Sequence, residues 1–422
     1  MVFSDPQSSR RHFLTATAAL AISAGMPRIA GAAGGRVVIV GGGWGGLAAA
    51  RELRRLAPQM DVVLIDRNSA FFSCPLSNRW LADLIEGRAL QHDYERAATR
   101  HGYRFLRAGV SAIDRERREV LAGDERIAYD WLILAVGIRY DYRAWFGDDT
   151  RAAAETESRF GCAFRPGEQA ALKQRLDAFT GGTLVMNVPL MPYRCPPAPY
   201  ERACMIASLF KARNIKGRII LLDPNPTPQG FNRIFNGQYR DRIVHVPQAG
   251  IRSLDPFGKK LATDVEDFHF DEAILMPPQQ AGDLAHQAGL TRDGWAEQEA
   301  LTFRARADER IYLVGDMIGR ASPLFGYYPK SGHMAAAQGR IAAAQIAARA
   351  AGGEAPQQLP ESICYVLAGA EPMEMMRLET SYRIRGDGAI MQTAKQHYDP
   401  QPRDEDIAWA KSMFADMLAG EI

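Results

Sequence analysis

The sequence predicts an α/β protein with two Rossmann-like units, one inserted into the other, followed by a C-terminal interface domain. Three observations carry this prediction. A glycine-rich turn lies between two apolar strand-like runs near the start, and a second strand–turn–helix–strand run spans residues 181–223. A further apolar run at 310–316 ends in Gly-Asp, far along the chain from the glycine-rich turn. Short apolar strands that alternate with helical segments are typical of parallel α/β sheets.

Residues 1–32 have the pattern of an export signal. Ser9 to Leu14 reads Ser-Arg-Arg-His-Phe-Leu, which resembles a twin-arginine (Tat) signal, and an apolar run follows up to Ala24. Small residues from Ala30 to Ala32 fit a cleavage site, and the apolar run is too short to span a bilayer. We therefore expect a cleaved signal and a mature chain in the periplasm, where disulfides are permitted, without a transmembrane segment.

The composition gives no electrostatic reason to expect a nucleic-acid partner. The 422 residues carry a formal net charge of +2, with 24% charged and 47% hydrophobic residues. These values are ordinary for a globular protein of two or three domains. No basic cluster interleaved with aromatic residues occurs, so we expect no nucleic-acid binding.

The first strand–turn–helix–strand unit carries a dinucleotide-binding fingerprint. The run at 36–40 leads into Gly-Gly-Gly-Trp-Gly-Gly, a helical stretch and a second strand that ends at Asp66. Gly41 permits the tight turn, Gly43 lets the backbone approach a pyrophosphate, and Gly46 allows helix and strand to pack closely. The N-terminus of the helix attracts phosphate, and Asp66 is placed to accept hydrogen bonds from a ribose. The same stretch supplies three further candidates for this site: Trp44, Gly45 and Arg67.

Two distant strands indicate that the dinucleotide is FAD. The apolar run at 128–137 ends in Ala-Val-Gly, and the run at 310–316 ends in Gly-Asp. Such strands are typical of flavoproteins with two dinucleotide-binding domains, in which they lie beside the FAD. The candidate FAD contacts on these strands are Ala135, Gly137, Gly315 and Asp316. Their separation predicts an FAD-binding domain in two parts, residues 33–150 and 291–355.

Residues 151–290 are expected to form an inserted Rossmann-like domain that does not bind NAD. The turn after its first strand, at 187–192, reads Asn-Val-Pro-Leu-Met-Pro. The glycines that let a backbone approach a pyrophosphate are missing from this turn, and prolines and bulky residues take their place. We therefore expect the protein to exchange electrons with something other than NAD(P)H.

After the Gly-Asp strand, the sequence predicts a helix of small residues and then a C-terminal domain at 356–422. Lys330 and Ser331 precede this helix, and a lysine there supplies positive charge that favours the anionic reduced flavin. The segment 404–420 has an amphipathic helical pattern with few basic residues, which favours a core or interface role over membrane binding. The eight histidines show no metal-ligand spacing.

Several motifs, taken in order, resemble the flavoprotein subunit of flavocytochrome c sulfide dehydrogenase. They are VVIVGGGWGG, FFSCPLSN, GEQ, PYRCPPAPYERA, MPPQQAG, GD, PKSG and CYVLAG, and the resemblance extends from the signal to about Cys364. Sulfide:quinone oxidoreductase resembles the chain more distantly. The resemblance implies an FAD-dependent oxidoreductase whose FAD is bonded through its 8α-methyl group to the cysteine at position Cys74. A covalent bond also suits an exported protein, because FAD lost in the periplasm is not replaced there.

The resemblance also implies a second redox centre, and here the sequence departs from the family. It implies a disulfide, attacked by sulfide, between Cys195 of the Arg-Cys-Pro-Pro motif and a cysteine shortly after Gly-Asp. The chain has Met317 and Ile318 there instead. Three alternatives are open: Cys162 is the partner, Cys195 acts alone, or the substrate is not sulfidic. Cys204 is not expected as a partner, because nine residues of helix span ~13 Å, beyond the ~7 Å limit between Cα atoms.

Two glutamates are candidates for proton transfer, and Cys195 is the candidate for the reactive thiol. Glu168 of Gly-Glu-Gln and Glu201 of Tyr-Glu-Arg are placed to move protons near the flavin, and equally to form salt bridges or helix caps. Cys195 lies at an expected strand-to-helix junction beside Arg194, where a helix dipole and a positive charge lower a thiol pKa. We therefore expect Cys195 to be the working thiolate, and Cys162, Glu168 and Glu201 are the other catalytic candidates.

The expected electron acceptor is a separate subunit. The resemblance implies a c-type cytochrome, and no Cys-x-x-Cys-His haem motif occurs in this chain. A small sulfur-containing compound is the expected donor. The missing second cysteine keeps two alternatives open, a flavin dehydrogenase for a non-sulfidic substrate and a non-catalytic flavin electron-relay subunit.

Overall fold

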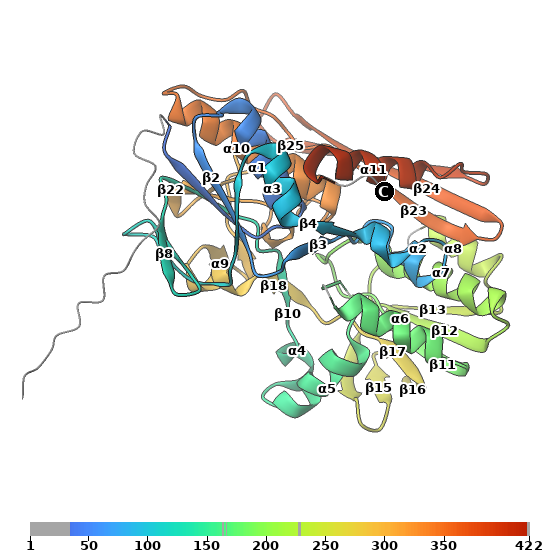
Figure 1. Cartoon of the computed structure of the whole chain (residues 1–422). Helices are drawn as coiled ribbons and strands as arrows, with labels where there is room; N and C mark the ends of the chain where they lie inside the picture. Colours follow the sequence, from blue (N-terminus) through green and yellow to red (C-terminus); the bar gives the residue numbers. More distant parts are fainter. Residues whose placement is uncertain (1–33, 163, 166, 227–228, 420–422) are drawn as a thin grey trace, which may run out of the picture.

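A computed structural model describes residues 34–162, 164–165, 167–226 and 229–419. The expected export signal, residues 1–32, lies outside the described residues. Two α/β units lie side by side, and an antiparallel sheet with one helix extends across both of them (Figure 1). No helix in the described residues is long and apolar enough to cross a membrane.

The first unit is built on a six-stranded sheet in the order β21-β22-β9-β1-β2-β5. Its strands are β1 (Arg36–Val40), β2 (Asp61–Asp66), β5 (Arg104–Arg107), β9 (Trp131–Leu134), β21 (Arg304–Ala305) and β22 (Asp308–Leu313). All of them except β21 run parallel to their neighbours. The central strand β1 is buried along its whole length, which explains why its sequence is a continuous apolar run rather than an alternating one.

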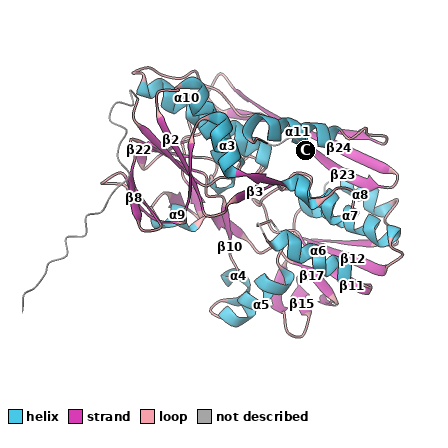
Figure 2. Ribbon diagram, viewed as in Figure 1, coloured by secondary structure: helices cyan, strands magenta, loops and turns pink. Residues whose placement is uncertain are grey.

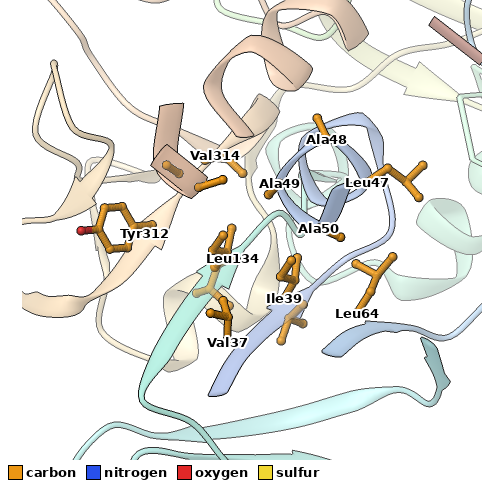
Figure 3. Close-up of a cluster of buried hydrophobic side chains, with 14 of the residues drawn as sticks. Val37, Ile39, Leu47, Ala48, Ala49, Ala50, Leu64, Leu134, Tyr312 and Val314 are labelled. Atoms are coloured by element: carbon orange, nitrogen blue, oxygen red, sulfur yellow. The ribbon is translucent and has the colours of Figure 1, made fainter. Parts of the chain in front are cut away.

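Two helices of the first unit pack unusually closely on one face of this sheet. They are α1 (Trp44–Leu56) and α10 (Gly332–Ala350). Glycine at position 339 permits the approach, because a Cβ atom there would clash with the carbonyl oxygen of Gly45 on α1. Figure 3 shows Ala49 and Ala50 of α1 on the side of the helix that faces Ile39 of β1 in the buried core. The small-residue pattern of the predicted helix therefore serves helix–helix contact next to the glycine-rich turn.

The second unit has a four-stranded parallel sheet in the order β13-β12-β11-β17. Its strands are β11 (Gly181–Asn187), β12 (Lys216–Asp223), β13 (Ile243–Pro247) and β17 (Glu272–Ile274), and its helices include α6 (Glu168–Ala178), α7 (Ala198–Ala212) and α8 (Gln229–Asn236). An antiparallel meander follows β13, formed by β14 (Ile251–Asp255), β15 (Lys260–Thr263) and β16 (Asp267–His269). The predicted α/β class with two Rossmann-like domains is confirmed (Figure 2).

The chain passes between the two units through one antiparallel ribbon. Strand β10 (Ile138–Tyr140) leads out of the first unit and pairs with β18 (Gln279–Ala281), which leads back. Helices α4 (Arg143–Phe146) and α5 (Thr150–Phe160) pack with the strands of the second unit. Helix α9 (Asp283–Gln287) already contacts β6 (Val110–Asp114) of the first unit. The structure thus places the return to the first unit at β18, earlier than the boundary at 291 taken from the sequence.

Shorter elements complete the first unit and the connections around its sheet. They are β3 (Ala70–Phe72), α2 (Ser77–Leu81), η1 (Gly87–Leu90), β4 (Gln91–Asp93), α3 (Tyr94–His101), β7 (Glu119–Ala122), β8 (Glu125–Ala128), β19 (Thr291–Arg292), β20 (Trp295–Ala296) and η2 (Gly315–Met317). Strands β3 and β4 pair with each other, and the segment between them carries Cys74 and α2.

The C-terminal part bridges both units. Its antiparallel sheet is formed by β23 (Ser362–Ala370), β24 (Met373–Ile384) and β25 (Ile390–Asp399), and α11 (Glu405–Met417) follows. Strand β23 packs against α7 of the second unit and α10 of the first. Helix α11 lies on the first unit, where Phe414 stacks on Trp44 with ring centroids 5.7 Å apart. The C-terminal segment therefore forms an interface with the other two parts of the same chain.

Candidate active site

A cavity of about 890 Å³ lies where the two units and the C-terminal part meet. Its walls come from the glycine-rich turn, the Cys74 segment, the ends of β9 and β22, the start of α7, the start of α10 and strand β23. This volume is within the range of cofactor and substrate sites in proteins. The candidates that line it are Gly41, Gly43, Trp44, Gly45, Asp66, Arg67, Cys74, Ala135, Gly137, Cys195, Glu201, Gly315, Asp316, Lys330 and Ser331.

The first end of the cavity has the form of a dinucleotide cradle. Gly41 has a φ of 104°, and a Cβ atom there would clash with the carbonyl oxygen of Ala135. A Cβ atom at Gly43 would meet nothing within 4 Å, so the backbone of the turn faces open space. Gly43 also brings no side chain to cap α1, which leaves the N-terminus of the helix available to a phosphate. Gly46 does not line the cavity, and its place is against the carbonyl oxygen of Gly41.

Asp66 stands at the end of β2, as the fingerprint requires. Its carboxylate accepts hydrogen bonds from the Gly42 N–H at 2.7 Å and from the backbone and side chain of Asn68. The carboxylate still lines the cavity, where it is available to a ribose hydroxyl. These residues fit an elongated dinucleotide such as FAD: the turn at Gly43 would hold its diphosphate and Asp66 its ribose.

The opposite end of the cavity is tied together by Arg194. Its Nε donates to the Asp316 carboxylate at 2.7 Å, and its backbone N–H donates to the side chain of Gln279. The next N–H in the chain, that of Cys195, donates to the carbonyl oxygen of Lys330 at 2.6 Å. These bonds fix the start of α7, in the second unit, against the Gly-Asp turn and α10 of the first.

Lys330 is a buried cation at this end. Its Nζ donates to the carbonyl oxygens of Asp316 and Ile318 at 2.7 and 2.9 Å, and lies 3.9 Å from the ring centroid of Trp295. Burial lowers the pKa of Lys330 to about 7, against the opposing effect of the Asp316 carboxylate. Its protonation therefore responds to an added charge, such as the one a reduced flavin carries.

Cys74 is half-buried at the turn that leads into α2. Its thiol lies 3.9 Å from the carbonyl oxygen of Phe164, which is its hydrogen-bond acceptor. Burial raises the pKa of the Cys74 thiol, and the Arg194 guanidinium acts in the opposite direction. The thiol thus lines the cavity, and Arg194 is the cation that lowers its pKa most.

The environment of Cys195 corrects one expectation. Its backbone is left-handed, with a φ of 52°, and this turns the residue into the cavity just before α7. Burial raises the pKa of the Cys195 thiol well above its usual value, and the neighbouring Cys364 thiol and Glu201 carboxyl group raise it further. The expected lowering by the helix dipole and Arg194 is therefore outweighed, because desolvation penalises a thiolate in this wall.

Cys364 is the functional candidate that the sequence reasoning missed. It lies on β23 and lines the same cavity as Cys74 and Cys195. After burial, the charge of Cys364 has the largest effect on the pKa of Cys195. Its motif, CYVLAG, was part of the family resemblance, but only the docking of β23 against α7 brings the thiol to Cys195.

Cys162 and Glu168, by contrast, do not line the cavity. Cys162 is buried, burial raises the pKa of its thiol to about 12, and its carbonyl oxygen accepts a hydrogen bond from Arg202. Glu168 lies in the first turn of α6 and accepts hydrogen bonds from the backbone N–H groups of Phe164 and Arg165. It therefore shapes the loop that supplies the Phe164 carbonyl, which corresponds to the capping alternative considered for it.

Glu201 occupies a position suited to proton transfer. It lies in the first turn of α7 and accepts hydrogen bonds from the Asn78 side chain at 2.6 Å and the Leu367 N–H at 2.8 Å. Burial raises its pKa to about 7. The carboxyl group faces the same cavity as Cys195 and Cys364, so it can hold a proton there at neutral pH.

The corresponding carboxylate of the second unit is occupied by protein groups. Asp223 ends β12 as Asp66 ends β2, yet it is fully buried. It accepts hydrogen bonds from the Tyr200 hydroxyl at 2.7 Å, from His245 at 3.1 Å and from Asn225. A nucleotide ribose has no access to a carboxylate enclosed in this way. Among the described residues, no group of three or more His, Cys, Asp or Glu residues is arranged to hold a metal.

Comparisons with known proteins agree with this geometry. The model of the central part of the sulfide dehydrogenase (flavocytochrome c) flavoprotein chain matches residues 169–277, and that of pyridine nucleotide-disulphide oxidoreductases matches 35–150. The flavoprotein chain of sulfide dehydrogenase (flavocytochrome c) from Chlorobaculum thiosulfatiphilum is 51% identical over 43 residues, which are 10% of this chain and 90% of that sequence. The chain belongs to the sulfide dehydrogenase flavoprotein family.

More distant relatives share the fold of this flavoprotein. Mouse mitochondrial sulfide:quinone oxidoreductase is 20% identical over 304 residues, which are 66% of this chain and 65% of the mouse protein, just under two thirds. The sulfide:quinone oxidoreductase structure from Aquifex aeolicus superposes with a TM-score of 0.69 at 18% identity, covering 85% of this chain and 87% of that one. The protein is an FAD-dependent oxidoreductase of the sulfide dehydrogenase and sulfide:quinone oxidoreductase type.

Proposed function

We propose that this flavoprotein oxidises sulfide, or a related small sulfur compound, at a redox-active pair formed by Cys195 and Cys364. The observation that carries the proposal is that both thiols line one cavity with Cys74 and the Gly-Asp turn. In this proposal the pair supplies the second cysteine that is missing after Asp316, and this favours a sulfidic over a non-sulfidic substrate.

The reaction at the pair is a thiol–disulfide exchange. Hydrosulfide attacks one sulfur of the Cys195–Cys364 disulfide, the S–S bond breaks, and a persulfide and a thiolate form. A second hydrosulfide removes the outer sulfur as disulfane and leaves two thiols. Bound FAD supplies the two-electron acceptor through which these thiols return to the disulfide, with loss of two protons.

The chain's own residues handle the protons and the charge. Glu201 takes a proton from a cysteine thiol as the disulfide closes again, because its pKa near 7 lets it exchange protons with solvent at neutral pH. Lys330 and Arg194 hold positive charge at the Gly-Asp end, where it favours negative charge on a reduced flavin.

We further propose a covalent bond from Cys74 to FAD, a separate c-type cytochrome subunit as acceptor, and export to the periplasm by the twin-arginine signal. The position of Cys74 inside the cavity supports the first of these. The similarity to a flavocytochrome c flavoprotein chain supports the second. Cell fractionation together with the N-terminal sequence of the mature chain tests the third, and full-length protein in the cytoplasm would contradict it.

Cysteine variants test the central proposal. We expect Cys195→Ser and Cys364→Ser each to lower sulfide-dependent reduction of cytochrome c by roughly a thousandfold, with normal flavin content, because each removes half of the redox pair. Cys204→Ser is the matched control, since Cys204 is buried on α7 and does not line the cavity. Peptide mapping of the oxidised protein should show a Cys195–Cys364 bridge.

Two results would reverse these assignments. A Cys162–Cys195 bridge in the peptide map, with wild-type turnover of Cys364→Ser, makes Cys162 the partner. Turnover by Cys195→Ala at the wild-type rate removes the thiol mechanism and leaves a flavin dehydrogenase for a non-sulfidic donor. Absence of turnover in the wild type with sulfide and cytochrome c favours an electron-relay subunit.

A further inference from the structure

The Cys74 thiol and the Arg194 guanidinium meet at a single backbone carbonyl. The thiol lies 3.9 Å from the carbonyl oxygen of Phe164, and Nη1 of Arg194 donates to the same oxygen at 3.4 Å. Both side chains line the cavity. Glu168 holds this carbonyl in place, because it accepts hydrogen bonds from the N–H groups of Phe164 and Arg165.

Arg194 is anchored so that it cannot turn away from the thiol. Its Nε donates to Asp316 at 2.7 Å, and its backbone N–H is bonded to Gln279. Its pKa is raised by Asp316 and neighbouring thiol and phenol groups against the effect of burial, so it stays charged. When Cys74 loses its proton, it can no longer donate to the Phe164 carbonyl, and the Arg194 guanidinium is the cation that favours the thiolate most.

We propose that Arg194 is a positioning residue for the attachment of FAD to Cys74, in which it stabilises the thiolate that attacks the flavin. This inference rests on the proposed covalent bond at Cys74. The thiolate rather than the thiol is the nucleophile, so a neighbouring cation sets the reactive population. None of the steps assigned to Cys195 and Cys364 requires this contact.

The attachment of FAD to Cys74 is a two-electron oxidation of the thiol and the methyl group, with the flavin ring as acceptor. The Cys74 sulfur forms a bond to the 8α-carbon, and one C–H bond of the methyl group breaks. The hydrogens of the thiol and of the methyl group, with two electrons, are formally taken up by the flavin ring, which is left reduced. Dioxygen in aerated buffer then oxidises the ring again, and the thioether remains.

Several charged groups surround the thiol and determine how its reactivity depends on pH. Burial raises the pKa of Cys74, Arg194 and then Arg202 lower it, and Asp316 and Glu168 raise it. Removing the positive charge of Arg194 therefore moves the thiol pKa upward. Each unit of that shift lowers the thiolate population about tenfold at neutral pH.

The experiment measures the rate at which FAD becomes attached to Cys74 in the Arg194→Gln variant. Full-length protein from riboflavin-starved cells is mixed with FAD in aerated buffer, and the acid-stable flavin is measured by in-gel fluorescence and intact mass. We expect attachment at pH 7 to be at least about tenfold slower than in the wild type, with the rate rising about tenfold per pH unit. Arg143→Gln, which removes an exposed cation outside the cavity, should attach FAD at the wild-type rate.

A second variant separates charge from shape. Arg194→Lys keeps the positive charge, so it should attach FAD faster than Arg194→Gln even if its affinity for FAD is lower. Equal attachment rates in the two variants would overturn the role of Arg194 but leave the covalent bond at Cys74 intact. A wild-type rate and pH profile in Arg194→Gln would do the same. Release of all flavin from the wild type on acid precipitation overturns the covalent bond itself, and this inference with it.

Discussion

At the scale of single residues, the surroundings of Glu201 determine its protonation. It is held by the Asn78 side chain and the Leu367 N–H, and burial raises its pKa to about 7. The carboxyl group is thus neutral below pH 7 and ionised above it. Only the ionised form accepts a proton from a thiol, so the oxidation of the two cysteines should require the ionised form.

We predict that kcat for sulfide oxidation rises with pH through a step near 7 in the wild type. Glu201→Gln should remove this step and lower kcat by roughly 10²–10⁴-fold, because the proton acceptor is lost. Stopped-flow measurement of flavin reduction from pH 5.5 to 8.5 gives the profile. A step that persists unchanged in the variant assigns it to another group, for example Lys330, whose pKa is also near 7.

Some residues of the candidate site could be predicted from the sequence and others could not. Asp66 and Gly43 could be placed in the site because they belong to one strand–turn–helix–strand unit of the chain, and Cys74 because its motif resembles that of the family. Cys364 could not, since it reaches Cys195 only through a contact between β23 and α7. The hydrogen bond from Leu367 to Glu201, which joins residues far apart in the chain, belongs to that contact. The raised pKa of Cys195 likewise depends on burial by distant segments.

At the scale of elements, the turn after β11 differs from a nucleotide-binding turn. Leu190 and Met191 of this turn are 68% and 55% exposed, and Pro189 precedes them where a nucleotide-binding turn has glycine. The carboxylate of Asp223 is enclosed by Tyr200 and His245. The strands and helices of this unit were predictable from their apolar periodicity, whereas its poor fit to NAD stays a prediction.

We predict that NADH and NADPH at submillimolar concentration do not bleach the flavin absorbance on the time scale of turnover. The turn after β11 leaves no room for a pyrophosphate against the backbone, and Asp223 is not available to a ribose. Anaerobic titration followed at the flavin absorbance maximum tests this, with dithionite as the control for a reducible flavin. Rapid bleaching by NADH would show a nucleotide site that these residues do not suggest.

Helix α11 is held over the cavity by a buried ion pair. Arg79 of α2 donates to Asp406 at 2.7 and 2.8 Å and to Asp404 at 2.9 Å, and the side chains of Arg79 and Asp406 are nearly inaccessible to solvent. Asp406 and Trp409 of the same helix line the cavity. The amphipathic pattern of this segment was recognised in the sequence, but its partner residue was not.

We predict that Arg79→Leu lowers the free energy of unfolding by about 3–5 kcal/mol, because it leaves Asp406 buried without its partner. The double variant Arg79→Leu/Asp406→Leu should recover most of this loss. Urea unfolding followed by tryptophan fluorescence measures both. Arg385→Leu, which breaks an exposed pair with Asp387, is the control and should unfold at the wild-type midpoint.

At the scale of the whole molecule, the cavity is formed by three parts of the chain, so FAD retention involves all of them. The proposed covalent bond at Cys74 is the one interaction that would survive when these parts unfold. We predict that acid precipitation leaves the yellow flavin with wild-type protein, and that Cys74→Ser releases it to the supernatant with its spectrum intact. Free FAD from the wild type would mean that retention depends on packing alone.

The ribbon of β10 and β18 has a consequence for how the protein is made. The outer edge of β9 is completed only by β22, and the entire second unit is synthesised between these two strands. At about 5–20 residues per second, the edge stays open for roughly ten to thirty seconds on the ribosome. All strands of the second unit are synthesised before β22, so the sheet of the first unit is completed last although its synthesis begins first. Until β22 arrives, an apolar strand edge is exposed to other nascent chains, and this interval is when the protein is most prone to aggregate.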